Sequence, residues 1–240
     1  MPISSLALLE VWERVYAQPI AVRALELVAL VQPEASRDGL ESMTVGARDR
    51  VLIALRSALF GTVFSSLARC ESCAEPLELN FDASEIMTPE IQPIEPLEIV
   101  LNGSRVRFRV PSSLDLIAVS SLQSAEQVRS KLLERCLLET EHLKHETVLQ
   151  DGELKTAITQ AMLQADPQAL IELQLNCPNC GHTWTALFDI ANFLWRELDA
   201  WARRTLRDVH KLASAYGWSE TQILALSPTR RRLYLELVSP

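Results

Sequence analysis

Four cysteines occur as two couplets with the same spacing. Cys70 and Cys73 form the first couplet, and Cys177 and Cys180 form the second, much later in the chain. A Cys-x-x-Cys turn directs two thiolates at one metal ion, and two such turns supply the four sulfurs of the tetrahedral shell that structural zinc prefers. A closed shell leaves no position for water or substrate. We therefore expect the metal to hold the fold together and to take no part in a reaction.

The segments that follow the two couplets are also alike. Each segment ends in Phe-Asp at the same distance from its first cysteine, at Phe81-Asp82 and at Phe188-Asp189. This pattern is typical of a zinc knuckle, in which a short strand, a tight turn and a returning strand follow one another. We predict that the two knuckles are halves of one Zn²⁺ site. Its predicted ligands are Cys70, Cys73, Cys177 and Cys180.

Other roles for the couplets remain open on sequence grounds, namely disulfides, redox centres or a degenerate site without metal. The cysteine count is odd, because Cys136 is a fifth. Residues 1–5 lack the basic region and the apolar core of a secretory signal. We therefore expect a reducing compartment, the cytoplasm, where paired cysteines bind metal more often than they form bridges. The apolar helical context of Cys136 predicts a buried, inert thiol.

Composition limits the class of protein. A chain of 240 residues with 48% hydrophobic content can bury a sizeable core, as one large or two small domains. A formal net charge of -8 argues against a nucleic-acid partner, because such partners are bound by a clustered basic surface. No apolar run is long enough to cross a bilayer. These features predict a helix-rich globular protein that does not enter a membrane.

Periodicity predicts one further hairpin between the couplets. Residues 97–101 and 105–110 flank an Asn-Gly turn, and Asn-Gly adopts the positive φ angles of a tight hairpin. Val106, Phe108 and Val110 alternate with three arginines. We expect the apolar face to be buried and the basic face to be solvated.

Helical spacing and capping residues predict most of the remaining elements. The predicted helices cover residues 3–17, 19–32, 44–60, a short turn after 82, a start at 111–115, and the ranges 124–143, 152–166, 190–216, 219–226 and 228–237. The polar segment 34–43 is predicted as a loop. The segment 142–152 is polar, and its two histidines, His142 and His145, are predicted to lie at the surface.

The C-terminal end combines basic and aromatic residues. In the helix 190–216, apolar residues form one stripe, and three cations spaced four apart lie on the other face. Such a row is either a solvated face or a docking strip for an acidic partner, and arginine and large aromatics dominate interfaces when they are desolvated together. The predicted partner-binding residues are Arg203, Arg207, Lys211, Trp218, Arg230, Arg231 and Tyr234.

Together these elements predict an α+β fold that is mostly helical, with small zinc-knuckle β-hairpins clamped by a four-cysteine site and a long C-terminal helix. The predicted division is an N-terminal helical segment, 1–61, and a zinc-knuckle core with the long helix and a helical tail, 62–240. A single continuous domain is the alternative to this division.

Several stretches of the chain carry a family resemblance. The tail has an aromatic-Gly-Trp-Ser turn at 216–219, an Ile-Leu-x-Leu helix at 223–226 and an Arg-rich Tyr-Leu-Glu ending at 230–236. With 48–56, 59–61, both Cys couplets and 188–202, the chain resembles the T-even phage baseplate hub assembly chaperone family. The resemblance is to the cysteine-containing branch associated with contractile injection systems and phage tail-like particles. It implies a non-enzymatic assembly factor, or a minor hub component, that binds baseplate or hub proteins and is sometimes retained in the particle.

Two other function classes compete with this resemblance. An enzyme is not expected, because the sequence has no G-x-S-x-G, phosphate loop, H-E-x-x-H or Gly-rich dinucleotide turn. A zinc-ribbon nucleic-acid-binding protein is the stronger rival. The net acidic charge argues against that rival, and so do the knuckle tips, Glu71-Ser72 and Pro178-Asn179, which lack Lys and Arg.

Overall fold

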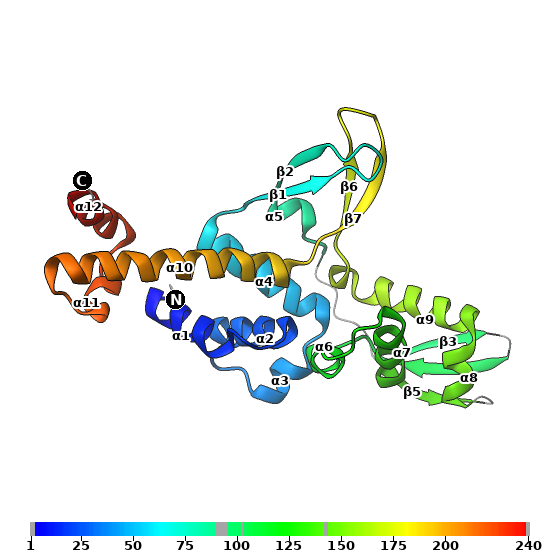
Figure 1. The fold of residues 1–240 in the computed structure, drawn as a ribbon. Coiled ribbons are helices and arrows are strands. Elements are labelled where there is room, and N and C mark those ends of the chain that lie inside the picture. The colour runs from blue at the N-terminus through cyan, green and yellow to red at the C-terminus, as the bar shows by residue number, and fades with distance from the viewer. Residues whose placement is uncertain (1–2, 90–95, 102, 142–143, 239–240) are drawn as a thin grey trace.

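The computed structural model describes residues 3–89, 96–101, 103–141 and 144–238. Within these residues the chain is mostly helical and has three small antiparallel sheets, with strand orders β1-β2, β3-β4-β5 and β6-β7. Helix α10 (Ile190–Tyr216) spans much of the molecule, and the chain's C-terminal helices lie at its far end (Figure 1). The predicted α+β class, with small hairpins and a long C-terminal helix, is confirmed.

The central core is helical. Helices α1 (Ser5–Val15), α2 (Ile20–Val31) and α4 (Val45–Phe60) pack with the first half of α10. Their apolar stripes meet in one cluster, in which Leu25, Leu52 and Leu198 are completely buried. This core therefore combines residues from both sides of position 61, and the division of the chain at that position stays a prediction.

Predicted caps define the ends of the core helices. The side chains of Ser4, Thr44 and Asp189 accept hydrogen bonds from backbone N–H groups in the first turns of α1, α4 and α10. At the other end, Gly61 stops α4 with a φ of 93°, and Gly217 stops α10 with a φ of 67°. Glycine adopts these angles without the steric cost of a Cβ.

Helix α3 (Arg37–Ser42) corrects the prediction of a loop over 34–43. The Ser36 hydroxyl accepts from the Gly39 N–H at 3.1 Å, and Leu40 is buried in the central core. The prediction was wrong because one cap and one buried leucine are enough to order a single helical turn within a polar stretch.

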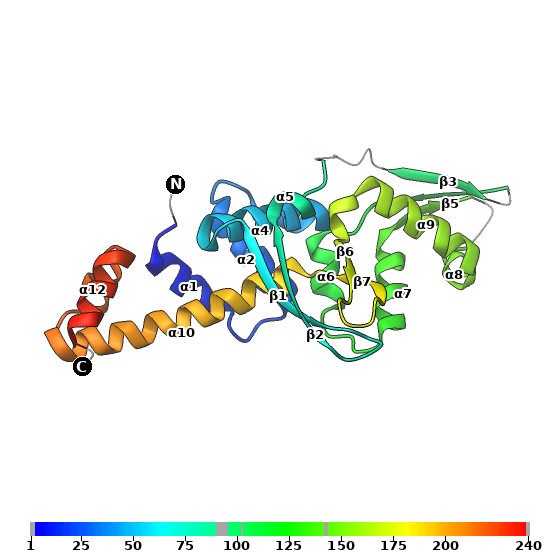
Figure 2. The same cartoon turned by 90° about the horizontal axis from the view of Figure 1, so that it is seen from above.

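A lateral lobe lies at the opposite end of the molecule from the C-terminus (Figures 1 and 2). It contains β3 (Leu97–Leu101), β4 (Ser104–Phe108) and β5 (Leu137–Thr140), which pack against α7 (Ala125–Cys136), α8 (His145–Gln150) and α9 (Gly152–Ala165). Val106, Phe108 and Ile158 are completely buried in its separate core. The predicted hairpin is confirmed, although Asn102 of its turn lies outside the described residues.

Strand β5 corrects a second prediction, that a helix runs over 124–143. The helix ends at Cys136, which is fully buried as predicted, and the next residues pair with β4. Phe108 lies opposite Leu137, and the Arg107 guanidinium binds Glu139 at 2.6 Å. Pairing with an available strand edge here outweighs local helical propensity. His145 is exposed, as predicted, and His142 lies outside the described residues.

A buried carboxylate joins the lateral lobe to the rest of the chain. Asp115, in α6 (Ser113–Val119), is completely buried and accepts hydrogen bonds from Arg109 and Arg135 at 2.5 to 3.0 Å. Burial alone would raise the pKa of Asp115, but the bonds from Arg109, the Ser112 N–H and Arg135 hold that pKa well below its usual range.

The arginines of β4 also have carboxylate partners, since Arg105 lies 3.3 Å from Glu98 and Arg107 lies 2.6 Å from Glu139. Arg105, Arg107 and Arg109 all remain partly exposed, as expected for the basic face of the hairpin.

Short elements complete the fold. They are α5 (Ala83–Ile86), the 3-10 turn η1 (Pro167–Ala169), α11 (Glu220–Leu224) and α12 (Pro228–Val238). Among the described residues, no helix has both the length and the apolar character needed to span a membrane.

Candidate metal centre

The two Cys couplets lie at the tips of two hairpins that project together from the body of the molecule (Figures 1 and 2). The first hairpin pairs β1 (Val63–Arg69) with β2 (Pro76–Asp82), and the second pairs β6 (Glu172–Asn176) with β7 (Thr183–Leu187). In each hairpin the side chains on one face are exposed and those on the other are partly or fully buried. The less exposed faces meet near the tips, where Leu77 and both first cysteines are buried.

The two turns have the same backbone. The Cys70 N–H donates to the Glu75 carbonyl at 2.9 Å, and the Cys177 N–H donates to the His182 carbonyl at 2.9 Å. The residue after the second cysteine adopts a left-handed conformation in both turns, with a φ of 61° at Ala74 and 72° at Gly181. The matching sequence segments therefore fold into matching knuckles.

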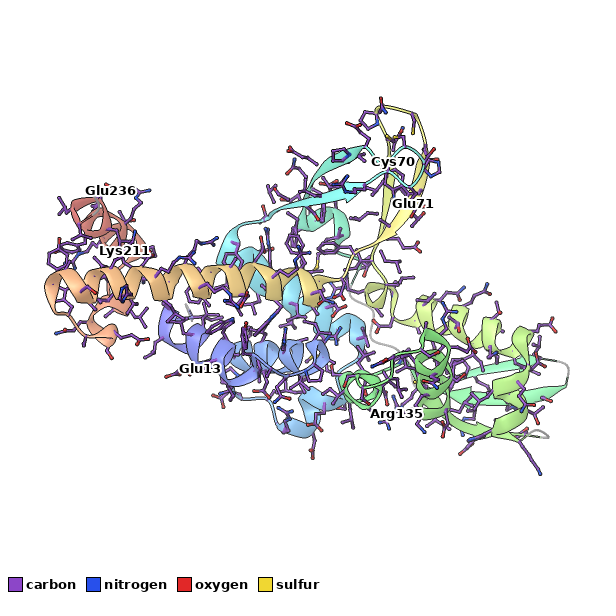
Figure 3. All side chains as sticks on the ribbon, viewed as in Figure 1. Glu13, Cys70, Glu71, Arg135, Lys211 and Glu236 are labelled. Atoms are coloured by element: carbon purple, nitrogen blue, oxygen red, sulfur yellow. The ribbon has the colours of Figure 1, made fainter. Side chains whose placement is uncertain are left out.

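The four sulfurs of the couplets come together between the hairpins. All four lie within 4.8 Å of one another. Two of the separations cross from one hairpin to the other, at 3.6 Å for Cys70–Cys180 and 3.6 Å for Cys73–Cys177. A disulfide has an S–S bond of about 2.05 Å, so none of the four is bridged. Figure 3 shows Cys70 and Glu71 at the end of this projection.

The dimensions of this cluster suit a structural metal. With Zn–S bonds of ~2.3 Å, a regular tetrahedron has sulfur–sulfur edges of about 3.8 Å. The two cross-hairpin separations of 3.6 Å are close to this value, and no two of the four sulfurs are more than 4.8 Å apart. An all-sulfur donor set favours zinc or an iron–sulfur centre over magnesium or calcium, which prefer oxygen. The cluster is therefore compatible with a structural metal site.

Hydrogen bonds and neighbouring sulfurs spread the thiol pKa values apart. The Glu75 backbone N–H and the Asn179 side-chain amide donate to the Cys73 Sγ and lower the pKa of Cys73 to about 6. For Cys180, the His182 N–H lowers the pKa, but desolvation and the three neighbouring sulfurs outweigh this effect and raise it to about 11. One thiolate therefore disfavours a second, and a bound dication would relieve this repulsion.

The base of the hairpins is held by an aromatic cluster and one arginine. The rings in contact in this cluster have centroids 5.2 to 5.7 Å apart, and they belong to Phe64, Phe81, Phe188 and Phe193. The buried Arg56 guanidinium lies 4.0 Å from the Phe64 ring centroid.

Arg56 also joins three elements by hydrogen bonds. It makes two bonds of 2.8 Å with Glu197 of α10, and it donates to the carbonyls of Gly61 and Val63 at 2.7 Å. Helix α4, strand β1 and helix α10 therefore meet at this one side chain. Sequence spacing gave no signal for this role, because the partners of Arg56 include a residue that is distant in the chain.

The predicted partner-binding residues do not share one environment. Arg207, Lys211 and Arg230 are exposed, whereas Trp218 and Tyr234 are half-buried in a ring cluster with Tyr216.

Two of the predicted partner-binding arginines differ from the rest. Arg203 is exposed but forms an ion pair with Asp199 at 2.9 Å and a hydrogen bond with the Tyr16 hydroxyl. Arg231 is only 6% exposed, although it belongs to a basic run of a kind that is usually solvated.

The fold and the cluster define a helical protein with two hairpins whose sulfur ligands meet. Comparison with known families gives a match over residues 27–195 to the family described as T4 bacteriophage base plate protein. The match covers more than half of the chain, and the chain therefore belongs to this family. The matched range includes both Cys couplets and ends within the first turns of α10. No curated protein and no solved structure matches the chain.

Proposed function

We propose that this chain is a non-enzymatic assembly factor, or a minor component, of the baseplate hub in a contractile tail or injection system. It acts by binding hub proteins in the cytoplasm during assembly, as a member of the hub assembly chaperone branch. The observation that carries this proposal is the family match over residues 27–195. The motifs in the tail, outside the matched range, support the assignment to the chaperone branch.

The proposed role of the four-cysteine cluster is to hold one structural Zn²⁺. The cross-hairpin sulfur separations of 3.6 Å and the all-sulfur donor set support this assignment. When bound, the metal would neutralise the thiolates and link the two tips. Since four protein ligands complete a tetrahedron, the site offers no open position for substrate, in keeping with a non-enzymatic role.

The proposed partner surface is the C-terminal end of the molecule. It is formed by the exposed side of α10, with Arg203, Arg207 and Lys211, and by the tail, with Trp218, Arg230, Arg231 and Tyr234. Its support is the combination of arginines with a ring cluster, because these residue types contribute most to interfaces. Figure 3 labels Lys211 and Glu236 at this end of the molecule.

Fractionation of assembling particles tests the proposed function. The chain would be followed by antibody through a gradient that separates free proteins, baseplate intermediates and finished particles. An assembly factor is expected in intermediates and not in particles, and a minor component is expected in both. Absence from both fractions would contradict the proposal.

A low-salt gel shift tests the rival function, nucleic-acid binding. The acidic net charge of -8 predicts no strong shift. Tight binding that weakens steeply with added salt would favour the rival.

A further inference from the structure

A hollow lies between α10 and α12, closed on one side by the start of α1. Its volume is about 450 Å³, within the range of ligand pockets. Four arginines line it: Arg204, Arg207, Arg231 and Arg232. Of the described residues that line the hollow, Asp208 alone carries a carboxylate. The hollow is therefore strongly basic within an acidic protein.

Arg231 is the unusual member of this group. It is almost fully buried, since only 6% of it is exposed. One of its terminal nitrogens donates to the Leu226 carbonyl at 3.4 Å, while its Nε is buried with no acceptor among the described residues. Burial lowers the pKa of Arg231, and the Asp208 carboxylate opposes that shift. A buried guanidinium without a direct ion pair is costly, so the burial of Arg231 lowers the stability of the fold.

Other buried arginines of the chain have a carboxylate in contact. Arg56 forms two hydrogen bonds with Glu197, and Arg48 forms an ion pair of 2.7 Å with Asp49. Within the described part of the chain, no carboxylate lies within ion-pair distance of Arg231. Arg231 thus lines a basic pocket and carries a hydrogen-bond donor, its buried Nε, that has no acceptor among the residues that the structure describes.

We infer that this hollow binds a carboxylate side chain from an acidic segment of a partner protein, with Arg231 as its central receptor. The guanidinium presents donors in a planar fork that matches a carboxylate. Trp201 and Leu235 also line the hollow and provide apolar surface for the aliphatic stem of a glutamate. The inference rests on the proposed function, and it narrows the broad C-terminal surface to one pocket with a defined ligand chemistry.

A binding assay with the full chain tests this inference. The probe is a fluorescein-labelled decapeptide of alternating Glu and Leu, and its counterpart carries Gln in place of Glu. We expect the Glu peptide to bind at least about tenfold more tightly, because a hydrogen bond between charged groups is roughly twice as strong as a neutral one. Arg231→Met should remove this preference, and Arg207→Gln, at an exposed lining position, should weaken it.

A matched control separates the pocket from general basic charge. Arg196 is an exposed arginine of α10 that does not line the hollow and lies outside the proposed partner surface. Arg196→Met should therefore change the affinity by no more than about twofold. Arg231→Met should also leave the melting temperature unchanged or raise it, because it removes a buried charge that has no direct ion pair. A purely structural role for Arg231 would instead lower it.

Each other outcome overturns the inference. Equal binding of the Glu and Gln peptides would remove the carboxylate requirement, and equal losses in the Arg196 and Arg231 variants would show diffuse attraction. Inorganic phosphate that binds while the Glu peptide does not would identify a small-anion site. Failure of the pocket is distinguishable from failure of the proposed function. If the Arg231 variant enters baseplate intermediates normally, only the pocket is wrong, whereas absence of the wild-type chain from all assembly fractions refutes the function.

Discussion

The two Cys hairpins are alike at their tips and different at their bases. At the tips, each turn has the same hydrogen bonds, and in each the first cysteine is buried and the second is exposed. At the bases, β1 and β2 have seven residues each and are tied to the body through Arg56, whereas the five-residue strand β7 leads almost directly into the Asp189 cap of α10. Each hairpin thus contributes two of the four sulfurs in the same way, while the two hairpins are attached to the helical core by different contacts.

The comparison predicts that the cysteines of the two hairpins are equivalent. Cys70→Ser and Cys177→Ser should each abolish zinc binding and lower the melting temperature by a similar amount. The free energy of unfolding should fall by several kcal/mol. This is less than the roughly 10 kcal/mol that zinc contributes in isolated zinc peptides, because this chain has a larger core. Elemental analysis of protein purified without added zinc, with thermal unfolding, measures both effects.

Cys136→Ala is the matched control, since Cys136 belongs to the separate core of the lateral lobe. It should keep one zinc per chain. Zinc retained after Cys70→Ser and lost after His182→Ala would mean that the second hairpin binds metal on its own.

Contacts at the base should contribute more to stability in the first hairpin than in the second. Arg56→Met removes the bonds to Glu197 and to two carbonyls, so unfolding free energy should fall by roughly 3 kcal/mol or more. Chemical denaturation measures the change. Arg69→Met, on the exposed face of the same hairpin, should change stability by less than about 0.5 kcal/mol. A loss in the Arg69 variant as large as in the Arg56 variant would show that the base has no special role.

The base of the second hairpin should respond to pH through Asp49. Burial raises the pKa of Asp49 from 3.8 to about 6, against the opposing effect of Arg48, and the nearby Asp189 carboxylate adds to the rise. The group binds its proton more tightly in the folded state. Its contribution to stability is therefore full below about pH 4 and is lost as pH rises through about 6, by at most about 3 kcal/mol.

The difference in stability between the wild type and Asp49→Asn, measured from pH 4 to 7, isolates this contribution. The metal site is the same in both proteins, so its own pH dependence cancels. A difference that stays constant with pH would contradict the assignment.

The smallest effect concerns the residue after the second cysteine. Ala74 and Gly181 have nearly the same positive φ, but alanine has a Cβ that disfavours it. Ala74→Gly should raise stability by about 0.5–1 kcal/mol, and Gly181→Ala should lower it by about 1 kcal/mol. No other atom lies within 4 Å of a Cβ built at Gly181, so the effect there is due to the backbone alone. Changes of the same sign in both variants would show that the turns are not equivalent.

The sequence predicted features that are local or repeated. Caps such as Ser4 and Asp189, the alternation at 106–110 and the duplicated Cys-x-x-Cys segments each depend on residues close in the chain. The α+β class and the clustering of the four sulfurs could therefore be predicted.

Features that depend on distant partners could not be predicted. Strand β5 exists because β4 offers it an edge, and Arg56 is important because Glu197 lies beside it in the folded chain. The burial of Arg231 could not be predicted either, because nothing in a run of three arginines indicates which one is buried.

Helix α10 sets both the distance and the angle between the base of the Cys hairpins and the C-terminal helices. Its 27 residues rise about 1.5 Å each, so the helix is about 40 Å long from the hairpin base to Gly217. Each residue also turns the helix by about 100°, because one turn takes 3.6 residues. A single residue inserted in the second half of α10 would therefore rotate the C-terminal helices about the axis by more than a quarter turn while moving them very little along it. Two partners held at the two ends of this helix would be fixed in spacing and in relative direction by the number of residues between them.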